Sequence, residues 1–291
     1  MMAEAQTAQR FSWTGEVTAQ MIASYQRDGF LMLEQFASPS ECTKLMHQTQ
    51  NLIEGFDAEA DQVVFSASGQ GHAASSYFMK SAANISFFLE AGAVDEAGRL
   101  IKPKQQAINK IGHALHDLDP VFQDFSHQDG LHALTKAVGF ADPLLLQSMI
   151  ICKQPFIGGE VNPHQDSTFL YTAPESCVGF WLAMEDATIE NGCMWAAPGA
   201  HTGPLRNRFV RGADGMEMVC LDEREMESCD VPLEAPAGTL ILLHGRLPHT
   251  SPENRSARSR YAYALHMIDG QAHYAEDNWL QRPADMPLTG F

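Results

Sequence analysis

The sequence predicts a mostly β fold with flanking helices, either a β-sandwich or a jelly-roll barrel, preceded by an N-terminal helical layer. Short apolar runs of strand-like composition follow one another after Pro143, and turn formers such as Gly158-Gly159 and Pro198-Gly199 separate them. Helical spacing of apolar residues, with helix start signals, is found instead near the N-terminus. Many short strands without obvious helices between them are typical of sandwiches and barrels.

The N-terminal layer begins with a helix, a strand and a second helix. Apolar residues recur at helical spacing from Thr14 to Asp28, so we expect a helix with Thr14 as its N-cap and Gly29 as its stop. A short strand over residues 30–36 should follow. Ser38-Pro39-Ser40-Glu41 is a capping box with proline at the first helical position, and it predicts a helix to about Gly55.

The middle of the chain has a less regular pattern. Residues 57–105 are either a lid over the functional site or surface excursions from a core domain. Residues 112–139 are expected to be helical in part and to end at Gly139. The strand-like runs that come afterwards are Leu144–Lys153, Val178–Met184, Cys193–Ala197, Asp230–Leu233, Thr239–His244 and Arg260–Ile268.

We expect residues 1–291 to form a single domain. No repeat, low-complexity run or convincing linker divides the chain, and 45% hydrophobic with 19% charged residues is an ordinary globular composition. Residues 1–105 should supply the helical layer and insertions, about 106–270 the β core, and 271–291 a C-terminal tail.

Charge and cysteine pattern limit the possible partners and location. Nineteen basic against 36 acidic residues give a net charge of −17, which disfavours nucleic acid or an anionic membrane as a partner. Six cysteines without a Cys-x-x-Cys pair predict reduced thiols in the cytoplasm. We find no signal-peptide pattern, no apolar stretch near the ~18 residues of a membrane span, and no peroxisomal tripeptide. We therefore expect a cytoplasmic monomer that binds a small molecule.

One constellation of side chains is typical of a metal site. His164 and Asp166 are two residues apart, so on a strand both would face the same ion. His249, which follows an apolar strand-like run, is a candidate third ligand. Two imidazoles and one carboxylate form the facial triad that holds Fe(II) and leaves positions open for O₂ chemistry.

Other motifs accompany these three residues along the chain. They are Ile108 to His116, Gln147-Ser148-Met149, Gly158 to Val161, Val178 to Trp181, Glu185 to Thr188, Glu190 to Cys193 and Asp277 to Leu280. With them, from about Tyr25 onward, the chain resembles the iron- and 2-oxoglutarate-dependent oxygenases of the phytanoyl-CoA dioxygenase (PhyH) family, in particular its domain-containing protein 1 group. The resemblance implies a double-stranded β-helix, which is a cupin-like jelly roll, with N-terminal helices.

The resemblance also implies a reaction and a set of site residues. Fe(II), 2-oxoglutarate and O₂ would be used to couple oxidative decarboxylation of 2-oxoglutarate, giving succinate and CO₂, to hydroxylation or a related C–H oxidation of a small organic substrate. Arg260, eleven residues after His249, would pair with the distal carboxylate of 2-oxoglutarate, a match that suits a planar guanidinium. The implied catalytic metal ligands are His164, Asp166 and His249, and the 2-oxoglutarate site would add Lys110, Met149, Trp181, Ser259 and Arg260.

Two other functions use the same residues differently. A non-catalytic jelly-roll binding protein could retain a vestigial iron site. A cupin-like metal enzyme that uses no oxo acid would leave Lys110 and Arg260 without a shared purpose.

Three further groups have a functional and a structural interpretation. A second histidine cluster comprises His113, His116, Asp117 and Asp119, and for it we favour structure or substrate contact over a second metal ion. A basic group comprises Arg206, Arg208 and Arg211, which form either an anionic-substrate site or a solvated surface. An aromatic group comprises Phe169, Tyr171 and Trp195, which either wall the pocket or belong to the core.

Overall fold

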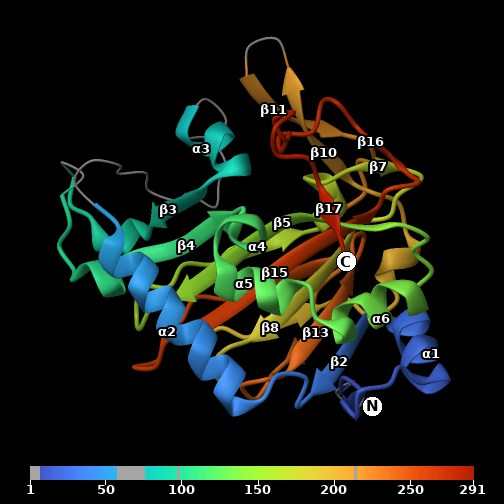
Figure 1. Cartoon of the computed structure of the whole chain (residues 1–291), viewed down its shortest axis with the longest axis horizontal. Helices are drawn as coiled ribbons and strands as arrows, with labels where there is room; N and C mark the ends of the chain where they lie inside the picture. Colours follow the sequence, from blue (N-terminus) through green and yellow to red (C-terminus); the bar gives the residue numbers. More distant parts are fainter. Residues whose placement is uncertain (1–6, 58–75, 97–98, 213–214) are drawn as a thin grey trace.

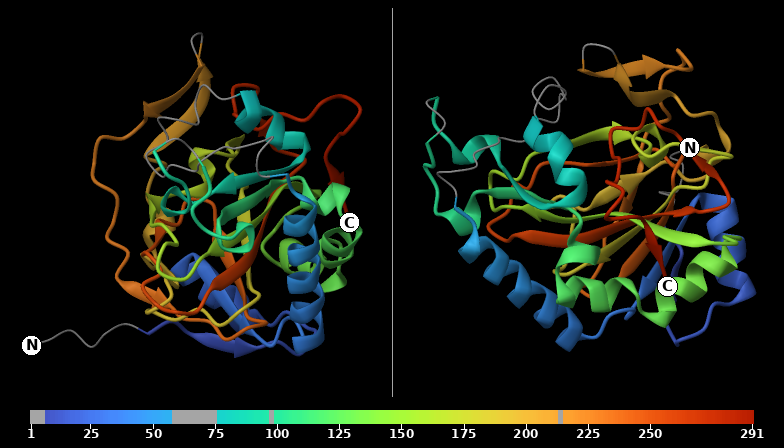
Figure 2. Two further views of the ribbon diagram at one scale, coloured as in Figure 1. Left: turned by 90° about the vertical axis from the view of Figure 1, so that its left-hand side faces the viewer. Right: turned by 45° about the horizontal axis from the view of Figure 1, so that its top comes forward.

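Two facing β-sheets form the centre of the protein, and helices pack on the outer face of the larger one (Figures 1 and 2). This computed structural model describes residues 7–57, 76–96, 99–212 and 215–291. The architecture confirms the mostly β, double-stranded β-helix prediction. Much of the segment expected to be a lid or surface excursion, residues 58–75, lies outside the described residues.

The larger sheet has the strand order β1-β2-β13-β8-β15-β5-β4-β3, with β17 paired to β5. Every pair in it is antiparallel except β1 with β2. The strands are β1 (Arg10–Ser12), β2 (Phe30–Glu34), β3 (Ile85–Leu89), β4 (Ile108–His113), β5 (Pro143–Lys153), β8 (Val178–Ala183), β13 (Leu240–His244), β15 (Arg260–Asp269) and β17 (Thr289–Gly290).

The smaller sheet has the order β12-β9-β14-β6, and two separate hairpin-like pairs lie near one end of the double sheet (Figure 1). All six strand-like runs predicted after Pro143 are strands, four in the larger sheet and two in the smaller. The remaining strands are β6 (Val161–His164), β9 (Met194–Ala196), β12 (Val231–Leu233) and β14 (His249–Ser251), with the pairs β10 (Asn207–Gly212) and β11 (Gly215–Cys220), and β7 (Thr172–Ala173) and β16 (His273–Tyr274).

Both faces of the larger sheet are buried, which explains the nearly continuous apolar strands. Leu182 and Tyr263 point to the helices, whereas their neighbours Trp181 and Ala264 point to the smaller sheet. Because side chains alternate along a strand, residues two apart share a face. Arg260 therefore lies on the inner face with Ala264, between the two sheets.

The helices cover the outer face as the sequence predicts, but the first one starts later than expected. The N-cap is Thr18, whose Oγ1 accepts from the Met21 N–H at 3.3 Å, so Thr14 lies outside the helix. Gly29, at φ +80°, ends it as predicted. The capping box at Ser38 is confirmed. The helices are α1 (Ala19–Asp28), α2 (Pro39–Gly55), α3 (Ser76–Lys80), α4 (Leu115–Leu118), α5 (Pro120–Ser126) and α6 (Asp129–Ala137).

The segments flanking the predicted β core also contribute strands. β1, β2 and β3 come from the region expected to provide helices and insertions, and β17 comes from the C-terminal tail. The strand predicted over residues 30–36 ends at Glu34, because Gln35 adopts a left-handed φ of 61°. In the described parts of the chain, no helix combines the length and the apolar character needed to cross a membrane.

Candidate functional site

A cavity of about 430 Å³ lies between the two sheets, and most of the predicted site residues line it. Its floor consists of inner-face side chains of β4, β5, β8 and β15 from the larger sheet. Its opposite wall comes from β6 and β14 of the smaller sheet. The predicted residues on its surface are Lys110, Met149, His164, Asp166, Trp181, His249 and Arg260.

His164, Asp166 and His249 converge at one end of this cavity. Register places His249 directly opposite His164 on neighbouring strands, and Asp166 starts a short helical turn, Asp166–Thr168, just after β6. One ligand atom from each residue lies within 4.8 Å of the others. Asp166 Oδ1 is 3.5 Å from His164 Nε2 and 3.7 Å from His249 Nε2.

Backbone carbonyl groups orient the two imidazole rings. His164 Nδ1 lies 2.9 Å from the Asn162 carbonyl oxygen, and His249 Nδ1 lies 3.0 Å from that of Leu247. A carbonyl only accepts, so each Nδ1 carries a proton, and in the neutral form of each ring Nε2 has the lone pair. Both lone pairs are therefore available at the point where the three side chains meet.

The charges of the triad suit a metal ion. Burial opposes ionisation of Asp166, but His266, His249 and His164 beside it hold the pKa of its carboxyl well below the usual value. Burial, together with the neighbouring His164, lowers the pKa of His249 to about 4. At neutral pH the triad thus contains an ionised carboxylate and a neutral His249, the forms that coordinate metals.

Arg260 lies at the other end of the cavity and is buried. Its Nη2 donates to Ser251 Oγ at 3.2 Å, and its guanidinium carbon is 5.3 Å from the centre of the Trp181 ring. Burial lowers its pKa to about 10, so it stays charged at neutral pH. Its Nε and Nη1 have no hydrogen-bond partner within the part of the chain that the structure describes. Buried donors of this kind are costly unless a ligand supplies acceptors.

A row of side chains crosses the larger sheet between the two ends of the cavity. Met149, Ala264 and Trp181 lie side by side on β5, β15 and β8, in one row across the sheet. Lys110 on β4 is level with Ile151, and its ammonium is 5.0 Å from the Phe88 ring centre. Burial lowers the pKa of Lys110 to about 7. The short side chain of Ala264 leaves room for a ligand between the triad and Arg260.

Comparison with known proteins identifies the family. Residues 25–262 match the phytanoyl-CoA dioxygenase (PhyH) family. The chain belongs to this family. A phytanoyl-CoA dioxygenase from Arabidopsis thaliana is 44% identical over 275 residues, which cover 94% of this chain and 96% of the relative. The phytanoyl-CoA dioxygenase domain-containing protein 1 of Bos taurus is 39% identical over 278 residues, 92% of this chain and 96% of the relative.

A solved structure confirms the fold of this PhyH-family chain. The crystal structure of EctD from S. alaskensis with 2-oxoglutarate and 5-hydroxyectoine is similar with a TM-score of 0.62. It is 19% identical, and the match covers 93% of this chain and 86% of EctD. Family membership makes this chain an enzyme of the oxygenase class.

One predicted 2-oxoglutarate residue, Ser259, does not reach the cavity. Its hydroxyl donates to Glu185 Oε1 at 3.1 Å, on the other side of the sheet from Arg260. Neighbours on an extended chain point in opposite directions, so a serine directly before an inward-facing arginine faces outward. Ser251 lies in the cavity and contacts Arg260 instead. It follows His249 by two residues on β14, and that spacing is the signal that could have identified it.

Two further cavity residues were not predicted. Lys153, opposite Arg260 on β5, donates from Nζ to the carbonyl oxygens of Gly159 and Ser251 at 2.7 and 3.0 Å, which ties the end of β14 to the loop before β6. His266 lies six residues after Arg260 on β15 and therefore on the same inner face. An even spacing from Arg260 is the sequence signal for it.

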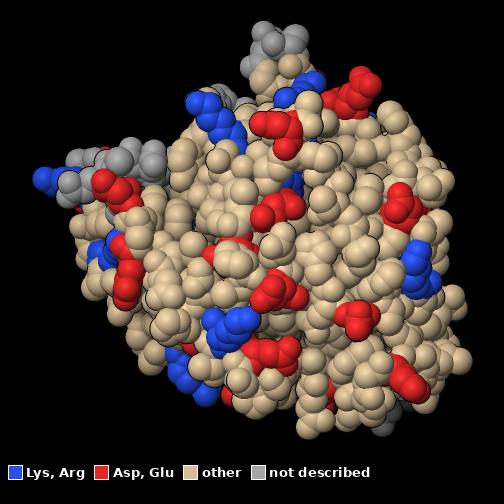
Figure 3. Space-filling view, in the orientation of Figure 1, with Lys and Arg blue, Asp and Glu red and all other residues tan. Residues whose placement is uncertain are grey.

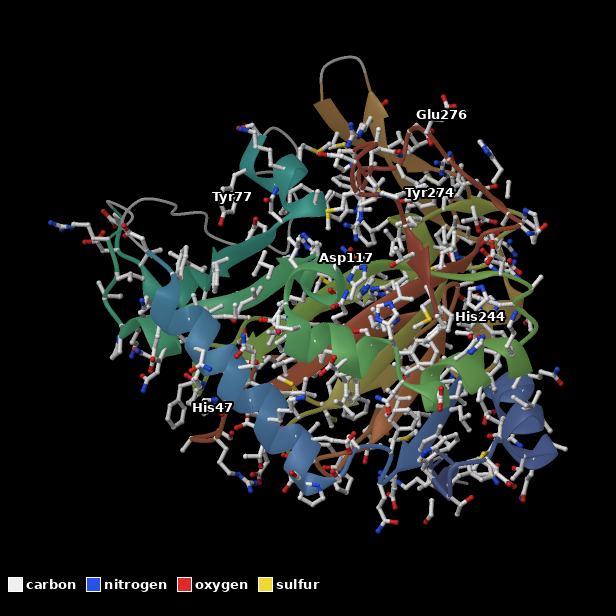
Figure 4. The ribbon with its side chains drawn as sticks, in the orientation of Figure 1. His47, Tyr77, Asp117, His244, Tyr274 and Glu276 are labelled. Atoms are coloured by element: carbon white, nitrogen blue, oxygen red, sulfur yellow. The ribbon has the colours of Figure 1, made fainter. Side chains whose placement is uncertain are left out.

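The second histidine cluster is structural rather than a metal site. His116 Nδ1 lies 2.7 Å from Ser148 Oγ, and Asp117 pairs with Arg282 at 2.8 Å (Figure 4). Asp119 caps α5 through the Val121 N–H. Among the described residues, the only group of His, Cys, Asp and Glu that converges on one point is His164, Asp166 and His249. Of the four residues in this cluster, His113 alone lines the cavity.

The three arginines of the predicted basic group hold the β10–β11 hairpin in place. Arg206 pairs with Asp222 and Glu227, Arg208 with Asp277, and Arg211 donates to the Trp279 carbonyl oxygen. They are therefore not a free anion site. Figure 3 shows carboxylates scattered over one face, with few basic side chains between them.

The predicted pocket aromatics lie in three different places. Phe169 lines the cavity. Tyr171 lies under the Arg208 guanidinium, 4.2 Å from it, and Trp195 packs with the core between the sheets.

Proposed function

We propose that this chain is an Fe(II)- and 2-oxoglutarate-dependent dioxygenase that hydroxylates, or similarly oxidises at a C–H bond, a small organic substrate. One observation carries the proposal. A single cavity holds the His164, Asp166 and His249 triad at one end and a buried arginine with unused donors at the other. A dicarboxylate that reaches from the triad to Arg260 would satisfy both ends.

Each site residue has a role in this proposal. The triad would hold Fe(II), and Arg260, oriented by Ser251, would hold the distal carboxylate of 2-oxoglutarate. Bound Fe(II) would supply the oxidising chemistry with O₂, and 2-oxoglutarate would be decarboxylated oxidatively to succinate and CO₂. The carbonyl partners of both imidazoles fix the ring orientations, and the Trp181 ring and Ser251 fix the guanidinium. A site that is fixed before binding loses little free energy in arranging itself.

The substrate would lie against the aromatic part of the cavity. Phe78, Phe169, Phe209 and Trp279 line this part, with the Phe78 and Trp279 rings stacked at 4.5 Å. Their apolar surfaces favour an apolar substrate and help to exclude water. The arginines of the nearby hairpin already pair with carboxylates or a carbonyl, which supports a substrate without the phosphates of coenzyme A.

We also propose a cytoplasmic location, a monomeric state and a single-domain organisation. The six cysteines are free thiols, as a reducing compartment requires. The larger sheet takes strands from both ends of the chain, which supports the single domain.

The test is an anaerobic titration of the protein with Fe(II) and 2-oxoglutarate. We expect the weak visible charge-transfer band of an iron-bound 2-oxo acid, loss of that band in His164→Ala, and a right-shifted 2-oxoglutarate titration in Arg260→Ala. Arg255→Ala, whose side chain is 84% exposed, is the matched arginine control and should behave like the wild type.

Three outcomes would contradict the proposal. Absence of the band at saturating 2-oxoglutarate would show that 2-oxoglutarate is not the co-substrate. Bound iron without succinate formation in the presence of O₂ would favour a non-catalytic jelly-roll protein. Consumption of O₂ without succinate would favour a metal enzyme that uses no oxo acid.

A further inference from the structure

We propose that His266 is a positioning residue that holds the Asp166 carboxylate so that only one of its oxygens faces the metal site. This inference rests on the proposed function for the identity of the metal site. His266 lies outside the triad, and its role is argued from its contacts with Asp166.

The two oxygens of Asp166 have different neighbours. Oδ1 lies 3.5 Å and 3.7 Å from the Nε2 atoms of the two triad histidines. Oδ2 points away from them and lies 3.3 Å from Nε2 of His266. The carboxylate is thus divided, with one oxygen toward the metal site and one toward His266.

The strand register brings His266 to this oxygen. His266 on β15 is directly opposite Gly179 on β8. Immediately after His266 the register between β15 and β5 shifts, and Leu146 is left over on β5. Irregularities of this kind re-aim side chains and are frequent beside active sites. Here the shift occurs at the residue that contacts Asp166.

Gly179 provides the space for the contact. A Cβ atom at residue 179 would lie 3.0 Å from Asp166 Oδ2 and 3.4 Å from His266 Nε2. A side chain at this position would crowd both groups, so that one of them would have to shift by a few tenths of an ångström. Backbone conformation does not demand glycine here, because Gly179 is not among the glycines with positive φ. The close approach of Asp166 and His266 is therefore the reason for a glycine.

The direction of the contact is fixed by chemistry. The 3.3 Å contact is an electrostatic contact and not an aligned hydrogen bond, since Oδ2 has no hydrogen-bond partner among the described residues; a carboxylate oxygen only accepts, so it is a proton on Nε2 of His266 that attracts it. Both side chains are buried, with 8% and 9% of their surfaces exposed, so water competes little for Oδ2. Nδ1 of His266 has no hydrogen-bond partner in the described part of the chain. Among the described residues, the polar contact of the His266 side chain is thus the one with Asp166.

The consequence is a metal site that keeps positions open. A carboxylate can bind a cation through one oxygen or both, and a second oxygen would occupy a position needed by the co-substrate. An N–H that holds Oδ2 aside favours binding through Oδ1 alone. Partners that orient a ligand in this way are typically worth 10- to 100-fold in metal affinity.

The experiment compares Co(II) binding to the purified full chain and its variants under anaerobic conditions. We expect His266→Leu to weaken Co(II) affinity about 10- to 100-fold and to change the visible absorption of the bound ion. His266→Gln, whose amide N–H can reach a similar position to Nε2, should restore affinity to within a fewfold and recover the spectrum. His201→Leu, at another buried histidine whose ring packs against His244 and not against the triad, should match the wild type.

Gly179→Ala gives a second, independent test. Its methyl group would enter the space beside Oδ2 and Nε2, so it should reproduce the weaker Co(II) binding and the altered spectrum without changing His266. Thermal melts of all variants establish that they are folded before the titrations are compared.

The inference is overturned if folded His266→Leu binds Co(II) with wild-type affinity and spectrum. It is also overturned if His266→Gln is as impaired as His266→Leu, since packing rather than the N–H would then matter. Failure of the proposed function looks different. In that case the wild type binds Co(II) but forms no succinate with Fe(II), 2-oxoglutarate and O₂.

Discussion

Ser251 and Ser259 are both close to Arg260 along the chain, yet only Ser251 contacts its guanidinium. Ser251→Ala removes an acceptor for a buried charge, an interaction worth about 1.5 kcal/mol, so we expect a roughly tenfold higher Kd for 2-oxoglutarate. Ser259→Ala is the matched control and should leave this Kd unchanged. Titration of the charge-transfer band measures both. Equal Kd values for the two variants would contradict the assignment.

At the scale of single residues, the spacing of His164 and Asp166 and the place of His249 after an apolar run predicted the triad. The resemblance to the PhyH family implied Arg260, eleven residues after His249, and the structure places it in the cavity with the triad. Ser259 was implied by the family resemblance, and the alternation of the strand turns its side chain away from the cavity that Arg260 lines. His266 was missed because its partner, Asp166, is 100 residues away in the sequence and only the fold brings the two together.

Among the elements, the start of α1 gives a direct test of helix capping. Thr18 accepts from the Met21 N–H, whereas Thr14 lies four residues before it and outside the helix. Thr18→Ala should therefore lower the free energy of unfolding by about 1 kcal/mol. Thr14→Ala should lower it by much less. Urea denaturation compares the two, and a larger loss in Thr14→Ala would contradict the N-cap assignment.

The strands that the sequence failed to predict contain polar or exposed residues, because they line the cavity or lie at the surface. β4 carries Asn109 and Lys110 into the cavity, which interrupts its apolar run. β11 is mostly exposed, so it lacks the pattern of a buried strand. The hairpin arginines resembled an anion site because a partner such as Asp277 is distant in the sequence. By contrast, β5, β8, β13 and β15 were predicted because both of their faces are buried.

Across the whole molecule, buried histidines make stability depend on pH. His116 is fully buried against Ser148, and burial, with the nearby Arg282, lowers its pKa to about 3. Burial also lowers the pKa of His113 well below its usual value. Unfolding returns each imidazole to a pKa of about 6.5, so below that pH the unfolded chain binds more protons. Stability is therefore unaffected above about pH 6.5 and falls as the pH drops toward 3.

We expect the metal-free protein to lose stability between pH 7.5 and 5.5, with about 1.4 kcal/mol of that loss due to His116 alone. Urea unfolding at the two pH values gives the difference, and His116→Asn should reduce it by that amount even if the variant is less stable at both. His47→Asn, on the exposed side of α2 (Figure 4), is the matched control and should leave the difference unchanged. If His116→Asn shows the full wild-type difference, protonation of this buried ring does not contribute to the acid sensitivity.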